Sequence, residues 1–371
     1  MVAQRRSELD DISELDGINQ LSQPDLDALA LGVTLLGCGG GGRVEQIVAQ
    51  LRHVDDGPLA TLVSADDRQL GLRHVMAVGF LGSTMVMDEK LPAGDELAGA
   101  VGAIEQWTGV TAEALMPSQI GGVCGLAVIS VARQLSLPVI DADLEGRSVP
   151  RLDQFSIAVA GRTTVPFAIT GPNGLKLVLD AADPPQVESV IRAAVTQTGG
   201  WSAFALGPVP FDELAGFAIL GSMSRALALG RIMLTTTGGS PESIGAALGG
   251  RTLCVGRVIA VSRLADISSF VRASFAILDF RDGAVVRVEA GSEYLMVLTD
   301  GEPVVTCPDI ISVLDARTHE PIDAGELGDG REIVVLTVPG PRWWTSTPER
   351  MAHVGPRAYG IDCDPIVAET A

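Results

Sequence analysis

The segment GGVCGLAVISVARQLSLPVIDAD, residues 121–143, decides the fold class that the sequence predicts. After two glycines, apolar residues recur at helical spacing, and Pro138 marks the end of that pattern. The run PVIDAD that follows has the character of a short buried strand. A helix that leads directly into a buried strand is typical of an α/β layer with a largely parallel sheet.

The same alternation continues on both sides of this segment. We expect strands over residues 33–37 (VTLLG), 60–68, 73–83, 112–119, 155–170 and 174–182. We expect helices from Ser22 to about Val33, and over residues 44–51, 95–109, 184–200 and 211–234. These elements together predict an N-terminal domain built as a mostly parallel α/β layer.

From Gly250 onward strands dominate, and the turns RDGA, TDGE and GDGR separate several of them as hairpins require. The predicted fold class is therefore α/β, with an N-terminal mostly parallel α/β layer domain and a β-rich C-terminal domain. The expected divisions are a flexible N-terminal segment over 1–21, an α/β domain over 22–160, strands and helices that complete or bridge it over 161–249, and the β-rich domain over 250–371.

Composition and charge limit the classes of partner. The 371 residues are 47% hydrophobic and 19% charged, which supports a large packed core. A net charge of −20 argues against nucleic acid and anionic membranes, because both attract basic surfaces. Five scattered cysteines without CxxC spacing, and no N-terminal apolar leader, favour reduced thiols in the cytoplasm. We expect a homo-oligomer that binds a small cyclic molecule.

A glycine-rich loop lies within TLLGCGGGGRVEQIVAQL, residues 34–51. Glycines between a strand and a helix would place free backbone N–H groups and a positive helix end at one spot, which suits an anion or a thiolate. The loop lacks the Lys-Ser/Thr of a phosphate-binding P-loop. A thiol at Cys38 would then have a lowered pKa. The alternatives are a tight turn and a buried cysteine that acts as a small hydrophobe.

A second glycine loop repeats this arrangement. Gly121 and Gly122 open a helix, and Cys124 lies in its first turn. Loops after parallel strands gather at one sheet edge, where ligands bind, so Cys38 and Cys124 are expected to face one crevice. The alternative for Cys124 is packing in the core.

Charged side chains follow two of the predicted strands. Asp141 and Asp143, with Glu145 and Arg147, come after the buried strand PVIDAD, and are expected to enter the crevice as a base, metal ligands or an orienting group. Glu89 lies in GSTMVMDEKLP. The alternatives are a capped loop with an internal ion pair and a solvated charged turn. The four histidines form no metal-binding motif, and no GxSxG is present.

Several of these segments, in the same order, resemble the S-methyl-thiohydantoin desulfurase family, a former domain of unknown function found alone or beside hydantoinase/oxoprolinase subunits. The resemblance covers about residues 26–365, and its most specific part is the Asp-Ala-Asp…Gly-Arg…Pro block. The matching segments are GCGGGG (37–42), GSTMVMDEKL (82–91), the run from Ile120 to Gln154, PDIISVLDA (308–316) and GPRAYGIDCDP (355–365).

The resemblance implies an α/β N-terminal domain, a β-rich C-terminal domain, and hydrolysis at a five-membered ring. Water would replace methanethiol at the ring carbon between the two nitrogens and leave a hydantoin. Such attack needs a nucleophile, donors for the developing charge and an acid near the departing sulfur. Relatives commonly carry Thr, Glu and Asn where this chain has Cys38, Gln119 and Cys124.

The predicted function is therefore a hydrolase of the S-methyl-thiohydantoin desulfurase type. Cys38 or Cys124 is the expected nucleophile, and Asp141 or Asp143 the base or orienting group. The expected substrate-binding residues are Gly39, Gly40, Gly41, Gly121, Gly122, Glu89 and Arg147.

Two alternatives stay open. One is a metal-dependent cyclic amide hydrolase with a divalent metal on Asp141 and Asp143, although the sequence itself requires no cofactor. The other is a non-catalytic partner or ligand-binding subunit of a hydantoinase/oxoprolinase-like system.

Overall fold

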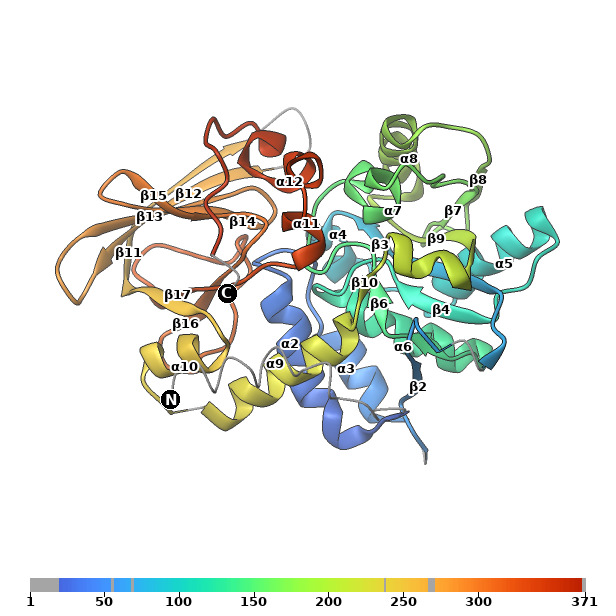
Figure 1. Ribbon diagram of the computed structural model, residues 1–371, viewed down its shortest axis with the longest axis horizontal. Helices are drawn as coiled ribbons and strands as arrows, with labels where there is room; N and C mark the ends of the chain where they lie inside the picture. Colours follow the sequence, from blue (N-terminus) through green and yellow to red (C-terminus); the bar gives the residue numbers. More distant parts are fainter. Residues whose placement is uncertain (1–19, 55–56, 68–69, 237, 266–270, 369–371) are drawn as a thin grey trace.

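The computed structural model describes residues 20–54, 57–67, 70–236, 238–265 and 271–368. Most of the predicted flexible segment, residues 1–19, lies outside this part. Figure 1 shows two bodies, an antiparallel β domain at the left and a sheet covered by helices at the right. The predicted fold class, an α/β N-terminal domain with a β-rich C-terminal domain, is confirmed.

The N-terminal domain is organised around an eight-stranded sheet. Its strand order is β1 (Gln20–Leu21), β2 (Ala60–Val63), β5 (Val139–Ile140), β4 (Ala114–Pro117), β3 (His74–Gly82), β9 (Trp201–Pro210), β7 (Phe167–Thr170) and β8 (Lys176–Leu179). Strands β2, β5, β4 and β3 run parallel, while β1 and the β9-β7-β8 group pair antiparallel. The sheet is therefore mixed: four adjacent strands are parallel, and antiparallel strands flank them on both sides.

Helices cover both faces of this sheet (Figure 1). The helices are α2 (Leu26–Leu36), α3 (Glu45–Arg52), α4 (Thr84–Glu89), α5 (Glu96–Thr108), α6 (Val123–Leu135), α7 (Ser156–Val159), α8 (Pro184–Thr198) and α9 (Ser222–Thr236). Along β3, Met76 and Val78 pack in the core beneath α2 and α6, while Val75 and Ala77 pack in the core beneath α8. Both faces are buried, which explains the continuous apolar runs in its strands.

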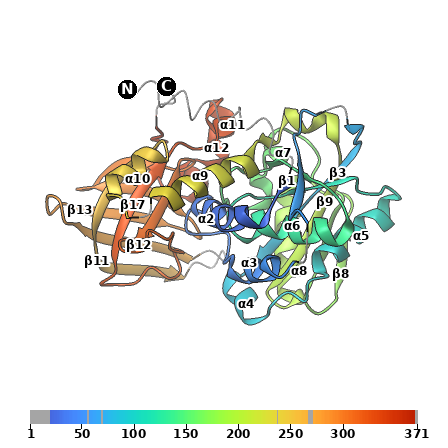
Figure 2. The same cartoon turned by 90° about the horizontal axis from the view of Figure 1, so that it is seen from below.

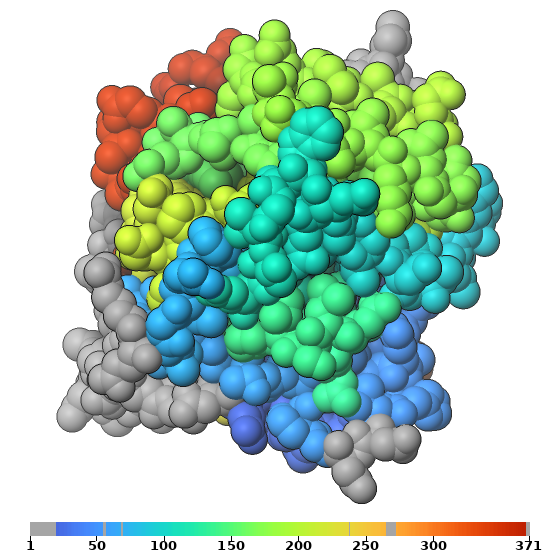
Figure 3. Space-filling view, turned by 90° about the vertical axis from the view of Figure 1, so that its right-hand side faces the viewer, coloured from blue at the N-terminus to red at the C-terminus, as the bar shows by residue number. Residues whose placement is uncertain are grey.

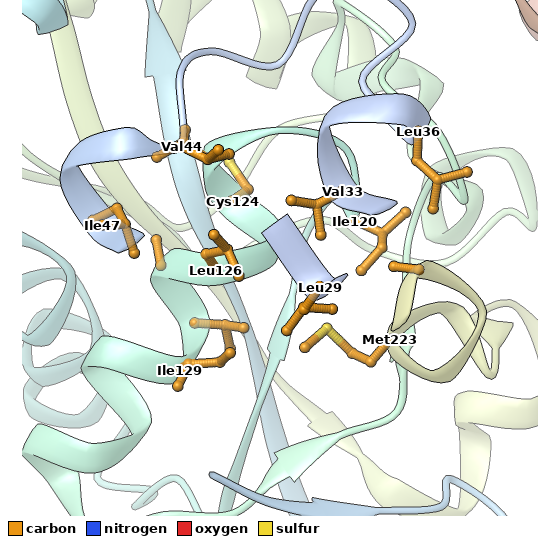
Figure 4. Close-up of a cluster of buried hydrophobic side chains, with 14 of the residues drawn as sticks. Leu29, Val33, Leu36, Val44, Ile47, Ile120, Cys124, Leu126, Ile129 and Met223 are labelled. Carbon is orange, nitrogen blue, oxygen red and sulfur yellow. The ribbon is translucent and has the colours of Figure 1, made fainter. Parts of the chain in front are cut away.

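The prediction of a strand at residues 33–37 is wrong. Helix α2 continues to Leu36, and all of its last four residues except Thr34 are buried. Figure 4 shows Leu29 and Val33 of this helix beside side chains of α6 and α9. A helix that is buried on nearly all sides has the continuous apolar run of a buried strand, so periodicity alone does not separate the two.

Two further differences from the predicted elements concern residues 155–166 and strand β9. Residues 155–166 do not form a strand, because the segment contains helix α7 and extended chain before β7 begins at Phe167. Strand β9 was not predicted at all. Its sequence WSAFALGPVP is buried on both faces and interrupted by Gly207 and Pro208, so it lacks the alternation of a half-exposed strand.

The C-terminal domain is a seven-stranded antiparallel sheet. Its order is β15 (Glu302–Thr306), β14 (Tyr294–Thr299), β13 (Val285–Ala290), β12 (Val271–Asp279), β11 (Arg251–Ala265), β17 (Glu332–Val338) and β16 (Ile310–Asp315). Three short helices flank it, α10 (Pro241–Ala247), α11 (Arg342–Thr345) and α12 (Pro348–Val354). A separate two-stranded pair joins β6 (Ala142–Asp143) to β10 (Ile219–Leu220).

The two domains share one apolar core. Ile310 and Leu314 of β16 and Leu336 of β17 belong to the same buried cluster as α2, α6 and α9. Figure 2 shows α2 and α9 at the junction, between the β domain and the mixed sheet. The domains are therefore joined by continuous packing and not only by the chain.

Helices α2 and α9 approach each other through small residues. A Cβ added to Gly32 would lie 1.8 Å from the carbonyl oxygen of Ala226, and one added to Gly230 would lie 1.6 Å from that of Ala28. Both distances are far below van der Waals contact, so the two glycines set how closely the helices pack.

We predict that Gly230→Ala destabilises the protein by at least about 2 kcal/mol, because the new methyl group forces the two helices apart. Gly102→Ala is the matched control, since a Cβ at this position of α5 would meet no atom within 4 Å. It should leave stability unchanged or raise it by up to about 1 kcal/mol through helix propensity. Urea unfolding of both variants measures the difference, and equal midpoints would contradict the packing argument.

Candidate active site between the two domains

A cleft of about 750 Å³ lies between the two domains. Its N-terminal wall comes from the ends of β3 and β4, the first turn of α6 and the segment 149–155. Its C-terminal wall comes from β11, β12 and the segments 291–293 and 323–325. The parallel strands β3 and β4 both end at the cleft, as ligand sites in α/β sheets commonly do.

The two glycine loops pack against each other. The N–H of Val123 donates to the carbonyl of Gly41 at 2.9 Å, and that of Gly122 donates to Val33 at 2.8 Å. Gly122 has φ +69°, and a Cβ there would lie 2.2 Å from the Gly41 oxygen. Close backbone approach thus explains the glycines, and it brings the loops to one place.

Of the five candidate glycines, Gly40 and Gly41 line the cleft. Gly39, Gly121 and Gly122 are packed behind it: a Cβ at Gly39 would lie 2.3 Å from the ring of Tyr294, and one at Gly121 would lie 2.6 Å from the Ser148 hydroxyl. Only the first pair is placed to contact a ligand.

Cys38 lies at the carboxyl end of α2, so its expected place at a helix amino terminus is wrong. The next helix, α3, begins only at Glu45. Cys38 has φ +51° and no exposed surface, its Sγ lies 3.5 Å from the Leu36 carbonyl, and it does not line the cleft. Burial raises the pKa of its thiol, the opposite of the lowering expected for a nucleophile.

Cys124 occupies the first turn of α6 and lines the cleft, as expected, but its thiol is not activated. Burial raises its pKa from the ordinary 9.0 to about 12, which disfavours the thiolate by about 4 kcal/mol. A helix amino terminus contributes at most about 2 kcal/mol in the other direction. Its Sγ also accepts the N–H of Phe80 at 3.3 Å. Desolvation therefore outweighs the helix end.

The two aspartates hold the backbone and do not line the cleft. Asp141 caps α9, because its carboxylate accepts the N–H of Met223 at 2.8 Å and both the N–H and the hydroxyl of Ser224. Asp143 is fully buried and accepts the N–H groups of Ile120, Glu145 and Gly146. Burial raises its pKa to about 7. This geometry is that of a capped loop, which is the alternative to a catalytic role for these residues.

Arg147 and Glu89 also lie outside the cleft lining. The buried guanidinium of Arg147 donates to the carbonyls of Asp309 at 2.6 Å, Tyr294 at 3.2 Å and Ser148 at 3.1 Å. These bonds join the loop after β6 to the β domain and occupy the donors expected for a substrate carboxylate. Glu89 is exposed at the end of α4.

Two buried glutamates from different domains do line the cleft. Glu145 is 1% exposed, and Glu293, in the turn between β13 and β14, is 4% exposed. In the sequence, Glu145 stands in the polar cluster after a buried strand, but no pattern singles out Glu293. Arg147 sets their relative position, because it is two residues from Glu145 and binds the carbonyl of Tyr294, the neighbour of Glu293.

The environment differs for the two carboxyl groups. Burial raises the pKa of Glu145 well above its usual value; the charges of Asp143 and Glu293 add to this, while the N–H of Val149 at 3.0 Å and the charge of Arg147 oppose it. Burial also raises the pKa of Glu293, but a hydrogen bond from Ser292 at 2.6 Å and the charge of Arg147 oppose the rise. Glu145 is thus the better proton holder of the pair.

Polar and aromatic groups complete the cleft. The Ser118 hydroxyl is buried and has no hydrogen-bond partner of ordinary geometry among the described residues; it lies near enough to the Cys124 thiol to lower the pKa of that group, and it is available to a ligand. Phe80 and Trp201 pack edge to face with ring centroids 5.7 Å apart, and Phe204 extends this apolar wall. Such a mixture of an apolar wall and a few polar groups is typical of small-molecule sites.

Two features are absent from the part of the chain that the structure describes. No group of three or more His, Cys, Asp or Glu side chains in this part of the chain is placed to hold a metal ion. Within the same residues, no helix has the length and apolar character to cross a membrane.

The fold and the cleft define a two-domain protein with an acid-lined site at the domain junction. Two family models match this chain: residues 24–181 match the S-Me-THD-like N-terminal domain, and residues 182–367 match the S-Me-THD-like C-terminal domain. The chain belongs to the S-methyl-thiohydantoin desulfurase-like family.

A crystal structure of a protein from Chromobacterium violaceum has the same fold. The TM-score is 0.76 at 21% sequence identity, with 95% of this chain and 100% of that chain covered. No curated protein matches this chain.

The family division at residues 181 and 182 does not coincide with a division of the fold. Strand β9 belongs to the C-terminal family segment, yet it pairs with β3 and β7 of the N-terminal segment. Figure 3 shows the same mixing on the surface, where residues near 50 (blue), 100 (teal) and 200 (yellow-green) lie side by side.

We predict that a thiol reagent labels the native protein rapidly at Cys363 alone. It is the one cysteine that is not buried, and the buried thiols have raised pKa values wherever a shift is resolved. Labelling with dithionitrobenzoate should give one rapid equivalent, and Cys363→Ser should remove it. Rapid labelling of Cys124, located by peptide mass spectrometry, would show that its thiol is more reactive than its burial implies.

Proposed function

We propose that this protein is a hydrolase that replaces the methylthio group of an S-methyl-thiohydantoin-type ring by water. The observation that carries the proposal is the pair of buried glutamates, Glu145 and Glu293, on opposite walls of one cleft. Family membership supports the class of substrate. The cleft volume of about 750 Å³ suits a five-membered ring with a side chain.

The reaction requires one base and one acid. Water attacks the ring carbon that carries sulfur, a C–O bond forms, and the C=N electron pair moves to the ring nitrogen. The C–S bond then breaks, and the sulfur leaves with its electron pair and takes a proton. The ring keeps a C=O and an N–H, so one water is consumed and one methanethiol is released.

Glu145 is the proposed acid. Its raised pKa favours the protonated carboxyl, which can donate to the departing sulfur. Glu293 is the proposed base that takes the proton of water, because Arg147 and Ser292 stabilise its carboxylate. The buried Ser118 hydroxyl lines the cleft and would donate to the ring nitrogen on which charge develops.

Direct attack by water is favoured over a cysteine nucleophile. Cys38 does not line the cleft, and the Cys124 thiol, with a pKa of about 12, is protonated at neutral pH. We therefore assign Cys124 to the floor of the cleft, where it packs beneath the substrate ring. The apolar wall of Phe80, Trp201 and Phe204 would contact the substituent on the ring.

We predict that Glu145→Gln lowers kcat at least 100-fold, since an amide cannot protonate the sulfur. The measurement is methanethiol release from an S-methyl-thiohydantoin, detected colorimetrically after removal of the protein. Glu302→Gln is the control, because this glutamate is exposed on β15, away from the cleft lining. If the unmodified protein releases no thiol from any such ring, the non-catalytic subunit becomes the better interpretation.

Cys124→Ala tests the route of attack in the same assay. Direct attack by water predicts that activity stays within about fivefold, and Cys254→Ala controls for a cavity at an equally buried cysteine of the β domain. Loss of activity in Cys124→Ala alone, together with a trapped thioether-linked intermediate, would show covalent catalysis.

The pH profile gives an independent check. As pH rises through the elevated pKa of Glu145, the acid loses its proton, so kcat should fall on the alkaline side. As pH falls through the pKa of Glu293, the base becomes protonated, so activity should also fall on the acidic side. Glu145→Asp should shift the alkaline limb. A profile without an alkaline limb would contradict the role of Glu145.

A further inference from the structure

A second cavity of about 470 Å³ lies next to the cleft, and the two share no lining residue. It is bounded by the segment 215–225 and by helices α11 and α12. The two sites are separated by one peptide unit, because Glu145 lines the cleft and Gly146 lines the second cavity. Ile219 of β10 packs in one buried cluster with Trp344 of α11 and Val354 of α12, and Figure 1 shows α11 and β10 near the junction of the two domains.

Three arginines line this cavity, although the whole chain carries a net charge of −20. Arg225 comes from the first turn of α9, and Arg342 and Arg350 come from α11 and α12. Two of them, Arg225 and Arg350, differ from the many arginines of the described chain that form ion pairs, such as Arg231 with Asp25 at 2.7 Å. A concentration of guanidinium groups in so acidic a protein therefore needs its own explanation.

Arg225 has no carboxylate partner among the described residues. Its guanidinium donates to the carbonyl of Pro339 at 2.6 Å. Asp143 and Asp309 act on it through their charge, but neither forms an ion pair with it. Burial lowers the pKa of Arg225, which marks a charge that is poorly solvated and not neutralised.

Arg350 also lacks an ion pair in the described part of the chain. Its guanidinium carbon lies 4.1 Å from the centre of the Trp343 ring, and Nη1 donates to the Ser346 hydroxyl at 3.0 Å. Stacking on the ring holds the planar group in place and leaves further N–H donors unused. Such a guanidinium is prepared to bind a carboxylate or a phosphate with two hydrogen bonds.

A buried hydroxyl adds a third donor to the same cavity. Ser222 is 3% exposed; its Oγ has no hydrogen-bond partner of ordinary geometry among the described residues, but it lies near enough to the Asp143 carboxyl to lower the pKa of that group. The amino end of α9 is already capped by Asp141, so the helix end itself does not create the site. The guanidinium groups and the Ser222 hydroxyl supply the donors of the site.

We propose that this cavity is a second ligand site, which binds a small organic anion through a carboxylate or phosphate group held by Arg225 and Arg350. Ile219, Leu220 and Trp343 supply an apolar wall for the remainder of the molecule. A volume of about 470 Å³ fits a ligand of this size. The proposal does not depend on the reaction assigned to the cleft.

Binding of two probes, benzoate and inorganic phosphate, tests this site. Isothermal titration at low ionic strength should show one saturable site, and Trp343 should report binding through a change in tryptophan fluorescence. Arg225→Gln and Arg350→Gln should each weaken binding at least tenfold, whereas Arg317→Gln, an exposed arginine of the β domain, should not. A preference for benzoate or for phosphate identifies the anionic group.

Two controls keep the test decisive. Thermal melting shows whether Arg225→Gln folds, and if it does not, Arg350→Gln alone decides, because that side chain bonds only within α11, α12 and their connection. Glu145→Gln should keep the binding, which separates this site from the cleft. The absence of saturable binding for both probes, or unchanged binding in the arginine variants, would overturn the proposal.

Discussion

The buried guanidinium of Arg147 is the interaction on which the cleft depends. Its bonds to the carbonyls of Tyr294 and Asp309 join a loop of the α/β domain to the starts of strands β14 and β16 in the β domain. Each bond joins a charged donor to a main-chain carbonyl, an interaction that contributes about 1.5–3 kcal/mol. The same bonds place Glu145 and Glu293 on facing walls, so one structural cation positions two acids that lie far apart in sequence.

Close backbone contacts support this arrangement from behind. The two glycine loops bond to each other at Gly41 and Val123, and α2 packs on α9 through Gly32 and Gly230. The glycine pattern favours either anion-binding N–H groups or tight turns, and in the structure most of these glycines let main-chain segments approach closely. The chemistry of the cleft comes instead from side chains whose pKa values burial shifts upward, and for Cys124 that shift is larger than the effect of the helix end.

The sequence predicted the elements that have a clear period and failed where burial removed it. Helix α6, strand β4 and the hairpins after Gly250 follow their expected patterns. The end of α2 and the whole of β9 are buried on nearly all sides, so helix and strand give the same apolar run. In the cleft, Glu145 follows a recognisable buried strand. Glu293 has no local signal, because only the contact between domains gives it a partner.

The strand β9 also bears on how such chains can vary. It follows the family division at residue 181, yet it contributes side chains to both faces of a sheet whose other strands precede that division. A chimaera that joined the halves of two relatives at this point would insert one parent's strand between two strands of the other. The two segments therefore pack as one unit, and a substitution in β3 or β7 would limit the side chains that β9 can carry.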